Sequence, residues 1–434
     1  MELKPLKGTR DFLPEEMIIR QKILEKVKNT FELFGFQPLE TPALESWEIL
    51  SAKGAGGEEI LKETYNFEDL GKRRVGLRYD LTVPLARVVA SNPNLPLPFK
   101  RYQIQNVWRY GDVSKGRLRE FLQADIDIVG SESMLADAEV IACAVSCLNS
   151  LGFKNFLVRI NNRKILSALV KFVRIEEEKA LEVFRSIDKL EKIGEEKVKK
   201  ELEEKGISQD SIKKIFDFIK IDETPEKVFE KIKDLSFDEG KEGIEELKEI
   251  VFYLKEMGTN AKIKIDLSLA RGLDYYTGPI FEISAEKEIG SIAGGGRYDK
   301  LIGIFAKKEI PATGISLGIE RIIEVMKKRK MVEEKKCKTK VFVATINKEI
   351  LKKSLPIIQK LRENGIETDF DLRERSLTRQ LEYANSLGIP FVLILGEKEL
   401  KEKKFRLRFM EKKIEKELSL DEVIRILKEP QENS

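Results

Sequence analysis

Two neighbouring segments constrain this chain more than any others. The first reads RGLDYYTG (271–278) and the second reads AGGGRYDKLIG (293–303). Three consecutive glycines in the second segment leave a backbone that a ligand can approach closely, because no Cβ stands in the way. The first segment holds an arginine, a carboxylate and two phenols, and it follows an alternating run that predicts a strand with one apolar face: Ile263, Ile265, Leu267 and Leu269. A cation, polar side chains and a bare backbone together indicate a small polar substrate bound beside a phosphate.

Each segment alone also fits a purely structural interpretation. RGLDYY is compatible with an edge strand that exposes its arginine, and the glycines at 294–296 are compatible with a flexible turn. Their adjacency, together with the motifs described below, favours a binding site.

The chain contains no histidine among its 434 residues. Ser-His and Cys-His mechanisms are therefore excluded, as are most catalytic zinc sites. The three cysteines cannot form a disulfide framework. Cys143 and Cys147 lie four positions apart on one face of a predicted helix, where buried packing is favoured over metal binding. We therefore expect no metal site built from protein ligands alone.

The length and composition indicate a multidomain protein without a membrane segment. A chain of 434 residues is too long for one ordinary core and predicts two or three domains. No apolar run approaches the roughly 20 residues that span a bilayer, and the first 16 residues lack an apolar signal segment, so we expect a cytoplasmic protein. Charged residues make up 35% of the chain, yet the net charge is only +4, which argues against a purely electrostatic coat for nucleic acid.

The first two thirds of the chain mix strands with helices. A helix is predicted from Pro14 to about Gly35, and another over 135–151. Strand-like pieces, of which the last two form a predicted hairpin, span 36–40, 75–84, 100–111 and 120–130. The strongly charged stretch 172–258 predicts a mainly helical insertion. Strand-like sequence resumes at 261, and residues 312–326 predict a last strand that runs into a helix.

The last hundred residues have a different period. After a polar linker they alternate as strand, helix, strand, helix, strand: VFVATIN, 348–364, GIETDFDL, 376–387 and PFVLILG. This alternation predicts a compact α/β domain with a largely parallel sheet. The segment FRLRFMEKKIEKELS predicts added strands before a closing helix over 420–428.

Polar residues accompany several of the predicted strands. Gln123, Asp125 and Asp127 alternate along one strand and therefore share a face. In the predicted hairpin Arg109 lies opposite Gln123 and Asp127, and Asp80 and Thr82 share a face in RYDLT. Burying such polar groups is costly unless they bind something polar. For each strand taken alone, the alternative interpretation is that these polar residues lie on a solvent-exposed face of the sheet.

These segments together resemble the histidyl-tRNA synthetase family, within class II of the aminoacyl-tRNA synthetases. The resemblance follows the order of the chain and covers nearly all of it: KGTRDFLPEE, FQPLETP (motif 1), VWRYGDVSKGRLREFLQADIDIVG (motif 2), RGLDYYTG, GGGRYDKLIG and GISLGIERI (motif 3). It implies an α+β catalytic domain on an antiparallel sheet, with a helical insertion and a C-terminal α/β anticodon-binding domain.

The implied domain boundaries agree with the changes of pattern. The catalytic domain would comprise 1–171 (motifs 1 and 2) and 259–326 (RGLDYY, GGGRYD and motif 3). The insertion would span 172–258, the linker 327–338 and the anticodon-binding domain 339–434.

The resemblance implies that the protein attaches L-histidine to tRNA(His) through a histidyl-adenylate, with ATP as substrate and Mg²⁺ on its phosphates. Asp80, Thr82 and Gln123 would hold the α-amino end of histidine. The imidazole would lie between Asp127 and Tyr276, with Tyr275 in its pocket, since a carboxylate and a phenol can test both ring nitrogens.

Three arginines would bind ATP, and two of them, Arg109 and Arg271, would also be catalytic. Arg109 and Arg271 would grip the α-phosphate, and Arg321 would grip the γ-phosphate. These guanidinium groups stabilise charge without transferring a proton. With no imidazole in the chain, we attribute any pH dependence near 6 to the ring of the substrate, with a perturbed carboxylate as the alternative.

Two departures from the family pattern concern the pocket. Many members carry an acidic residue two places after the motif-2 arginine, where this chain has Gly111 followed by Asp112. The sequence therefore does not assign the side chain that orients the adenine. Asp80 and Asp127 stand where bacterial members typically have glutamates, so the pocket keeps its charge with a different shape.

The resemblance also implies the partners of the chain. A homodimer is expected through the motif-1 region 36–45, which includes Pro42. Arg373, Arg375 and Arg379 are candidate tRNA contacts, with surface solvation as the alternative for each.

Two alternative functions share this catalytic fold. The first is a non-catalytic regulator that acts with ATP phosphoribosyltransferase in histidine biosynthesis. It typically lacks the C-terminal domain and the RGLDYY arginine, both of which are present here. The second is a class II synthetase for proline, threonine or glycine, and these enzymes lack RGLDYY.

Overall fold

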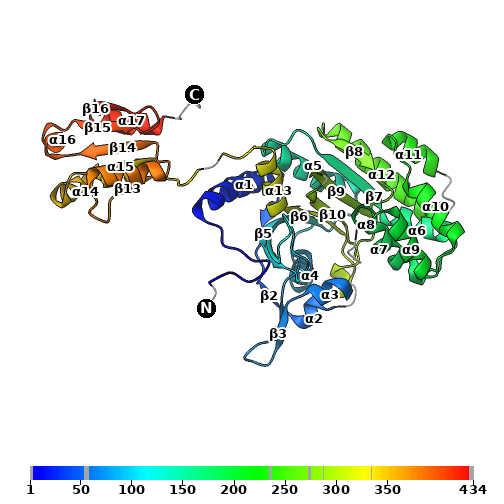
Figure 1. Ribbon diagram of the computed structural model, residues 1–434. Helices are drawn as coiled ribbons and strands as arrows, with labels where there is room; N and C mark the ends of the chain where they lie inside the picture. Colours follow the sequence, from blue (N-terminus) through cyan, green and yellow to red (C-terminus); the bar gives the residue numbers. More distant parts are fainter. Residues whose placement is uncertain are drawn as a thin grey trace. The chain divides into compact units, whose positions relative to one another are not determined.

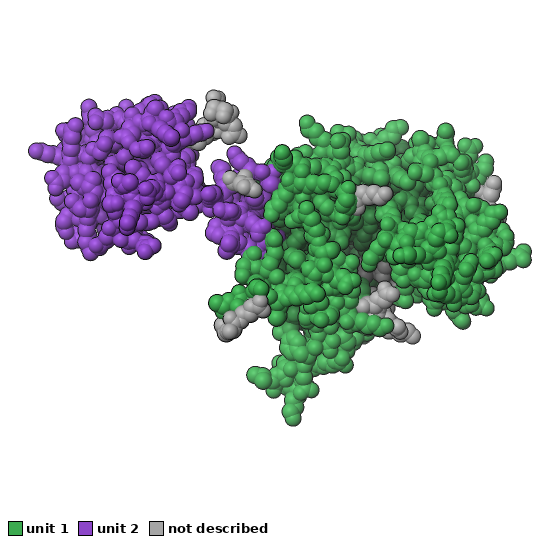
Figure 2. All heavy atoms as spheres, in the orientation of Figure 1, with its two compact units in different colours: residues 1–11, 23–331 green, residues 12–22, 332–434 purple. Residues whose placement is uncertain are grey.

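The computed structural model describes most of the chain, namely residues 3–52, 58–233, 237–271, 275–286, 288–333 and 335–429. The chain divides into two compact units (Figure 2). The larger unit comprises residues 1–11 and 23–331, and the smaller unit comprises residues 12–22 and 332–434. Residues 54–57, whose sequence GAGG predicts a loop, lie outside the described residues.

An eight-stranded sheet forms the centre of the larger unit (Figure 1). In spatial order its strands are β1 (Gln37–Pro38), β5 (Phe99–Trp108), β6 (Glu120–Val129), β11 (Ala312–Gly318), β10 (Gly290–Arg297), β9 (Pro279–Glu286), β7 (Leu157–Asn162) and β8 (Lys262–Ile265). Neighbours from β5 to β7 are antiparallel, whereas β1 and β8 join the two edges in parallel. The predicted antiparallel sheet is thus confirmed for its centre, and the edges make the whole sheet mixed.

Helices α5 (Met134–Ser150) and α12 (Asp238–Glu256) pack on this sheet and on each other. The side chain of Ser133 caps α5 by accepting a hydrogen bond from the Leu135 N–H. Cys143 and Cys147 are free and fully buried along this helix. The predicted packing role of the two thiols is therefore confirmed.

Four helices and a small sheet precede β5. The sheet has the order β2 (Leu44–Ser46), β4 (Arg74–Leu77) and β3 (Asn66–Glu68). The helices are α1 (Pro14–Leu33), α2 (Trp47–Leu50) and α3 (Glu58–Glu63), and α4 (Thr82–Ser91) follows β4.

The strand predicted over 75–84 is wrong in its second half. β4 ends at Leu77, and the Asp80 carboxylate accepts a hydrogen bond from the Val83 N–H at 3.1 Å. This bond satisfies one of the free N–H groups in the first turn of α4 and so favours helix over strand. Asp80 and Thr82 therefore flank a helix N-terminus and do not share a strand face.

The charged stretch in the middle of the chain is helical, as predicted. Its elements are α6 (Arg163–Phe172), η1 (Glu177–Lys179), α7 (Ala180–Asp188), α8 (Leu190–Ile193), α9 (Glu195–Glu204), α10 (Gln209–Ile219) and α11 (Pro225–Ile232), followed by α12. The strand predicted over 263–269 is shorter than expected. β8 ends at Ile265 because Asp266 starts a turn, in which its carboxylate accepts a hydrogen bond from the Ser268 N–H at 3.0 Å.

The larger unit ends with a strand and a helix. After the short helix η2 (Ile302–Ile304), β11 runs directly into α13 (Ile319–Lys328). This arrangement confirms the strand and helix predicted over 312–326.

The smaller unit contains a five-stranded sheet in the order β13 (Thr368–Phe370), β12 (Val341–Thr345), β14 (Phe391–Leu395), β15 (Phe405–Phe409) and β16 (Ile414–Leu418). Its helices are α14 (Lys348–Glu363), α15 (Leu377–Ser386), α16 (Glu397–Glu402) and α17 (Leu420–Lys428). The predicted alternation of strands and helices is confirmed. The sheet is parallel over β13, β12 and β14 and antiparallel over β15 and β16, so it is less parallel than predicted.

No helix in the described part of the chain has the length and apolar content that a membrane crossing requires.

Candidate active site

A cavity of about 500 Å³ opens in the larger unit over β6, β10 and β11. Nine residues that the sequence analysis assigned to histidine or ATP line it: Asp80, Thr82, Arg109, Gln123, Asp127, Arg271, Tyr275, Tyr276 and Arg321. They come from segments far apart in the chain, and the fold brings all of them together. Arg373, Arg375 and Arg379 belong to the smaller unit.

The hairpin of β5 and β6 supplies one wall of the cavity. Its existence is confirmed, but its predicted register is wrong. Gln123 pairs with Gln105, and Asp127 pairs with Arg101. Arg109 follows the end of β5, where its backbone N–H bonds to the Arg119 carbonyl. It still reaches the same cavity because it lies in the long loop, residues 109–119, that joins β5 to β6.

The three glycines of β10 make room for protein side chains. A Cβ on Gly294 would lie 2.4 Å from a guanidinium nitrogen of Arg271, and one on Gly296 would lie 2.8 Å from the ring of Tyr276. A Cβ on Gly295 would lie 2.0 Å from the Gly314 carbonyl oxygen of the adjacent strand. The glycines thus allow an arginine and a tyrosine to lie flat on the sheet beneath the ligand space.

Three aspartates form an acidic floor around one buried arginine. Arg101 is 0% exposed, and its guanidinium lies 2.8 Å from Asp127 Oδ2 without hydrogen-bond geometry. The Tyr298 hydroxyl donates a hydrogen bond to the other oxygen of Asp127. Asp80 and Asp125 each keep one buried oxygen without a hydrogen-bond partner. Such acceptors are costly to bury and favour a ligand that donates hydrogen bonds.

Burial changes the ionisation of this floor. It raises the pKa of Asp125 to about 7, with Arg101 opposing the rise and Asp127 adding to it. It also raises the pKa of Asp80 to about 6, although the Val83 N–H, Arg109 and Arg101 each lower that pKa. Burial also raises the pKa of Asp127, while Arg101 and Tyr298 lower it. A cationic ligand group would restore the charged forms of these carboxylates.

Gln123 and two tyrosines complete this end of the cavity. The Gln123 amide donates a hydrogen bond to Ser316 Oγ at 2.7 Å, and its buried carbonyl oxygen has no partner. The rings of Tyr275 and Tyr276 meet edge to face with centroids 4.9 Å apart, and Tyr275 also meets Tyr298 at 5.8 Å. These contacts fix the orientation of the aromatic wall.

Arginines dominate the other end of the cavity. Arg271 pairs with Glu282 at 3.0 Å. The Arg109 Nε donates to the Tyr79 carbonyl at 2.8 Å, and Arg321 donates to the Ser291 carbonyl at 2.6 Å. Burial lowers the pKa of Arg321, and Arg117, Arg271 and Arg109 lower it further. Guanidinium groups that repel one another across a cavity favour a multiply charged anion between them.

The sequence analysis missed several residues of this cavity. Arg117, Glu282 and Tyr298 all line it, together with Glu63 and Asp188. Asp125 lines it as well; its strand face was predicted, but no role was assigned to it. Arg117 and Tyr298 stand inside the motifs that were singled out, so their chemistry was visible in the sequence. No sequence signal marks Glu63 or Asp188, because each reaches the cavity from a separate helix.

The arginines of the smaller unit differ in availability. Arg375 pairs with Asp371 at 2.6 Å and stacks on the ring of Tyr383, with its Cζ 3.9 Å from the centroid. These contacts indicate a structural role for Arg375. Arg373 and Arg379 are exposed.

We expect the free energy of unfolding to fall as the pH rises from about 5 to 7.5. The native chain keeps protons on Asp80 and Asp125 that the unfolded chain, with aspartate pKa values near 3.9, has already released. Their contribution is fully present at low pH and is lost as the pH passes 6 and 7. No histidine titrates in the same window. The expected fall is on the order of 2–4 kcal/mol.

Denaturant unfolding at a series of pH values measures this slope. Asp125→Asn should remove most of it, whereas Asp238→Asn, at a fully exposed carboxylate, should leave it unchanged. An unchanged slope in Asp125→Asn would show that the buried carboxylate is already ionised at pH 5.

The chain resembles known proteins in both sequence and structure. A family described as "Histidyl-tRNA synthetase" matches residues 8–322, and one described as "Anticodon binding domain" matches residues 340–430. Relatives named "Histidine--tRNA ligase" include one from Aeropyrum pernix, 42% identical over 91% of both chains, and one from Clostridium tetani, 40% identical over 98% of this chain and 97% of the relative. The crystal structure of histidyl-tRNA synthetase from Nostoc sp. PCC 7120 superposes with a TM-score of 0.85, at 33% identity, and covers 98% of this chain and 99% of that one.

The fold is that of a class II aminoacyl-tRNA synthetase. Within that class, the chain belongs to the histidyl-tRNA synthetase family.

Proposed function

We propose that this protein joins L-histidine to tRNA(His) at the expense of ATP, through a histidyl-adenylate. Membership of the family supports the reaction. The observation that carries the proposal is the cavity itself. One end holds buried acceptors without partners, and the other holds several arginines, so the cavity suits an amino acid beside a triphosphate.

Asp80, Thr82 and Gln123 would hold the α-amino group of histidine. An ammonium group carries three donors, and Asp80 Oδ2 and Gln123 Oε1 are buried acceptors without partners. Asp127 and Tyr276 would flank the imidazole, and Tyr275 would close its pocket. Asp125 adds a carboxylate to this end that the sequence analysis did not assign.

Arg109, Arg271 and Arg321 would bind the phosphates of ATP, and Arg109 and Arg271 would also be catalytic. Their guanidinium groups suit the charge that builds up at the α-phosphorus. Mg²⁺ would arrive with ATP on the β- and γ-phosphates, since this ion usually takes only one or two carboxylates from a protein. Glu282, paired with Arg271, and Glu320, next to Arg321, are two carboxylates in the cavity lining that could hold it. The described residues contain no group of three side chains able to hold a metal by themselves.

The chemistry proceeds in two transfers. A carboxylate oxygen of histidine attacks the α-phosphorus in line and forms an acyl–phosphate bond, and the bond to the β-phosphate breaks to release pyrophosphate. The terminal ribose hydroxyl of the tRNA then attacks the acyl carbon, and AMP leaves. Because the chain has no histidine, we infer that a phosphate oxygen of the adenylate accepts the hydroxyl proton. The protein contributes mainly by positioning and by charge stabilisation.

The domains divide this work. Residues 1–171 and 259–326 would form the catalytic domain, and 172–258 would be its insertion. Residues 327–338 would link it to the anticodon-binding domain at 339–434, which agrees with the match to an anticodon-binding family. Arg373 and Arg379, which are exposed, are the better candidates for tRNA contact, while Arg375 already has Asp371 as its partner.

The regulatory alternative is less well supported. The chain retains the C-terminal domain and Arg271, both of which such a regulator typically lacks. The relatives described above are named as ligases.

We also infer a cytoplasmic homodimer assembled through residues 36–45. β1 lies at the edge of the central sheet, and Leu44, at the start of β2, is 46% exposed. Sedimentation is expected to give twice the chain mass of 49.9 kDa. A stable monomer with full activity would contradict this assembly.

A charging assay tests the proposed function. The full chain, with ATP, Mg²⁺ and labelled histidine, is expected to charge a tRNA(His) transcript and to release AMP. Transcripts of other tRNAs should remain uncharged. Failure to charge tRNA(His) under these conditions would contradict the proposal.

A further inference from the structure

Gly111 stands two places after the motif-2 arginine, where many family members carry an acidic side chain. A carboxylate from another helix lies beside it. A Cβ on Gly111 would lie 3.3 Å from Glu63 Oε1 and 3.5 Å from Glu63 Oε2. Glu63 is the last residue of α3. The carboxylate that is missing from the sequence at position 111 is therefore present in the same space from position 63.

Several contacts hold the end of α3 against residues 110 and 111. The Tyr110 N–H donates to the Glu63 carbonyl at 2.7 Å, and the rings of Tyr65 and Tyr110 meet edge to face at 5.6 Å. The C-terminal end of α3 is tied to the small sheet as well, because the Leu77 N–H donates to the Tyr65 carbonyl at 2.9 Å. These bonds hold the Glu63 backbone in place beside residues 110 and 111.

The Glu63 side chain is available to a ligand. It lines the cavity, is half-buried, and forms no ion pair with another described residue. Arg117 approaches the same point, with a guanidinium nitrogen 3.4 Å from the Cβ position on Gly111. Ile60 and Phe121 line the cavity nearby, and the Arg109 guanidinium lies 5.5 Å from the centre of the Phe121 ring.

This end of the cavity fits a flat base with an exocyclic amine. A carboxylate accepts hydrogen bonds only, so it attracts the 6-amino group of adenine and repels the 6-keto oxygen of hypoxanthine or guanine. The face of Phe121 and the apolar side chain of Ile60 suit a stacked purine. With the α-phosphate of ATP at Arg109, the base would lie beside Phe121 and Ile60.

We infer that Glu63 recognises the 6-amino group of the adenine of ATP, in place of the acidic residue that Gly111 lacks. The inference rests on the proposed function and adds a residue that determines its nucleotide specificity. Gly111 is then small because the carboxylate of Glu63 needs its side-chain space. The competing role for Glu63 is to position Arg117 and the connection 109–119 through its charge.

Histidine-dependent pyrophosphate exchange with three nucleotides separates these roles: ATP, inosine triphosphate, and purine riboside triphosphate, which has no 6-substituent. The unmodified chain should prefer ATP over both analogues. Glu63→Ala should lower kcat/KM for ATP by about 10- to 100-fold and bring it close to the value for purine riboside triphosphate. Glu63→Gln should recover activity with inosine triphosphate, because an amide N–H can donate to the keto oxygen.

Moving the carboxylate from position 63 to position 111 gives the most specific test. The φ angle of Gly111 is not positive, so its backbone accepts a side chain. Gly111→Glu alone should impair exchange, because its Cβ would meet the carboxylate of Glu63. Glu63→Ala combined with Gly111→Glu should regain the preference for ATP.

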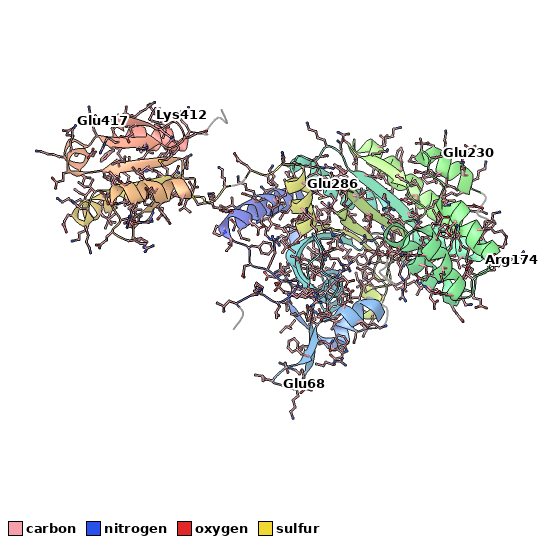
Figure 3. All side chains as sticks on the ribbon, viewed as in Figure 1. Glu68, Arg174, Glu230, Glu286, Lys412 and Glu417 are labelled. Carbon is pink, nitrogen blue, oxygen red and sulfur yellow. The ribbon has the colours of Figure 1, made fainter. Side chains whose placement is uncertain are left out.

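Glu68→Ala is the matched control, since Glu68 is exposed at the end of β3 in the same region (Figure 3). It should leave all three values unchanged. Histidine binding without nucleotide and the unfolding midpoint should be the same in every variant, which shows that each variant is folded. If Glu63→Ala lowers kcat/KM for ATP and purine riboside triphosphate by the same factor, Glu63 only positions its neighbours and the inference is overturned. A complete absence of exchange in the unmodified chain would overturn the proposed function itself.

Discussion

Arg271→Ala is expected to slow histidine-dependent pyrophosphate exchange by about 30- to 1,000-fold, or about 2–4 kcal/mol in the barrier. The guanidinium lies flat over Gly294, where a Cβ would come within 2.4 Å of it, and it points into the cavity beside Glu282. Burial lowers the pKa of Arg271, but Tyr276, Glu282 and Asp188 raise it by more, so the side chain stays charged. Its loss should remove stabilisation of the charge that builds up at the α-phosphate.

The fold should survive this substitution. Glu282 keeps a second partner, because Arg159 lies 3.3 Å from its other oxygen. Arg271 has a φ angle of 48°, and alanine carries the same Cβ, so the backbone strain there does not change. Arg329→Ala provides a matched control, since Arg329 also pairs with a glutamate, Glu286 (labelled in Figure 3), at 2.8 Å. Arg329 is not among the residues that line the cavity. Near-normal exchange by folded Arg271→Ala would refute its role.

Arg101→Met is expected to destabilise the protein by about 3–5 kcal/mol at pH 8. Arg101 is fully buried and lies against Asp127, and it lowers the pKa values of Asp80, Asp125 and Asp127. Without its charge, the aspartates remain buried without compensation. Methionine fills a similar volume, so the effect should come from charge and not from a cavity.

The pH dependence distinguishes this electrostatic cause from a packing defect. At pH 5 Asp80 and Asp125, whose pKa values rise further without Arg101, should be protonated, and the destabilisation should be much smaller. Combining Arg101→Met with Asp127→Asn should recover part of the loss at pH 8. Equal destabilisation at pH 5 and pH 8 would contradict the account of the acidic floor.

The strands and helices were largely predictable because their patterns are local. The alternation in 120–130 and the strand-to-helix change in 312–326 depend on neighbours within a few residues, and both are confirmed. The exceptions at 75–84 and 263–269 have one cause. In each, an aspartate side chain bonds to a nearby backbone N–H and replaces strand with a helix start or a turn.

The residues that line the cavity were largely predictable from the sequence, but the contacts between them were not. All nine residues assigned to histidine and ATP line it. The register of β5 and β6 depends on the length of the connection at 109–119, so the pairing of Arg101 with Asp127 was not visible in the sequence. Nor was the purpose of the three glycines, which depends on where Arg271 and Tyr276 lie in space.

The attribution of pH dependence near 6 to the substrate alone needs revision. Burial raises the pKa of Asp80 to about 6 and that of Asp125 to about 7, so both carboxylates titrate in the same range as an imidazole. A histidine analogue with a shifted ring pKa separates the two sources. The acid limb of kcat/KM follows the analogue if the ring titrates and stays in place if the aspartates do.

The central claim is that this cavity activates histidine with ATP. Pyrophosphate exchange by the full chain, measured with each of the twenty amino acids in turn, tests it most directly. The account predicts strong exchange with histidine, no comparable exchange with the other nineteen, and no need for tRNA. Exchange that depends on a different amino acid, or none with histidine, would contradict it.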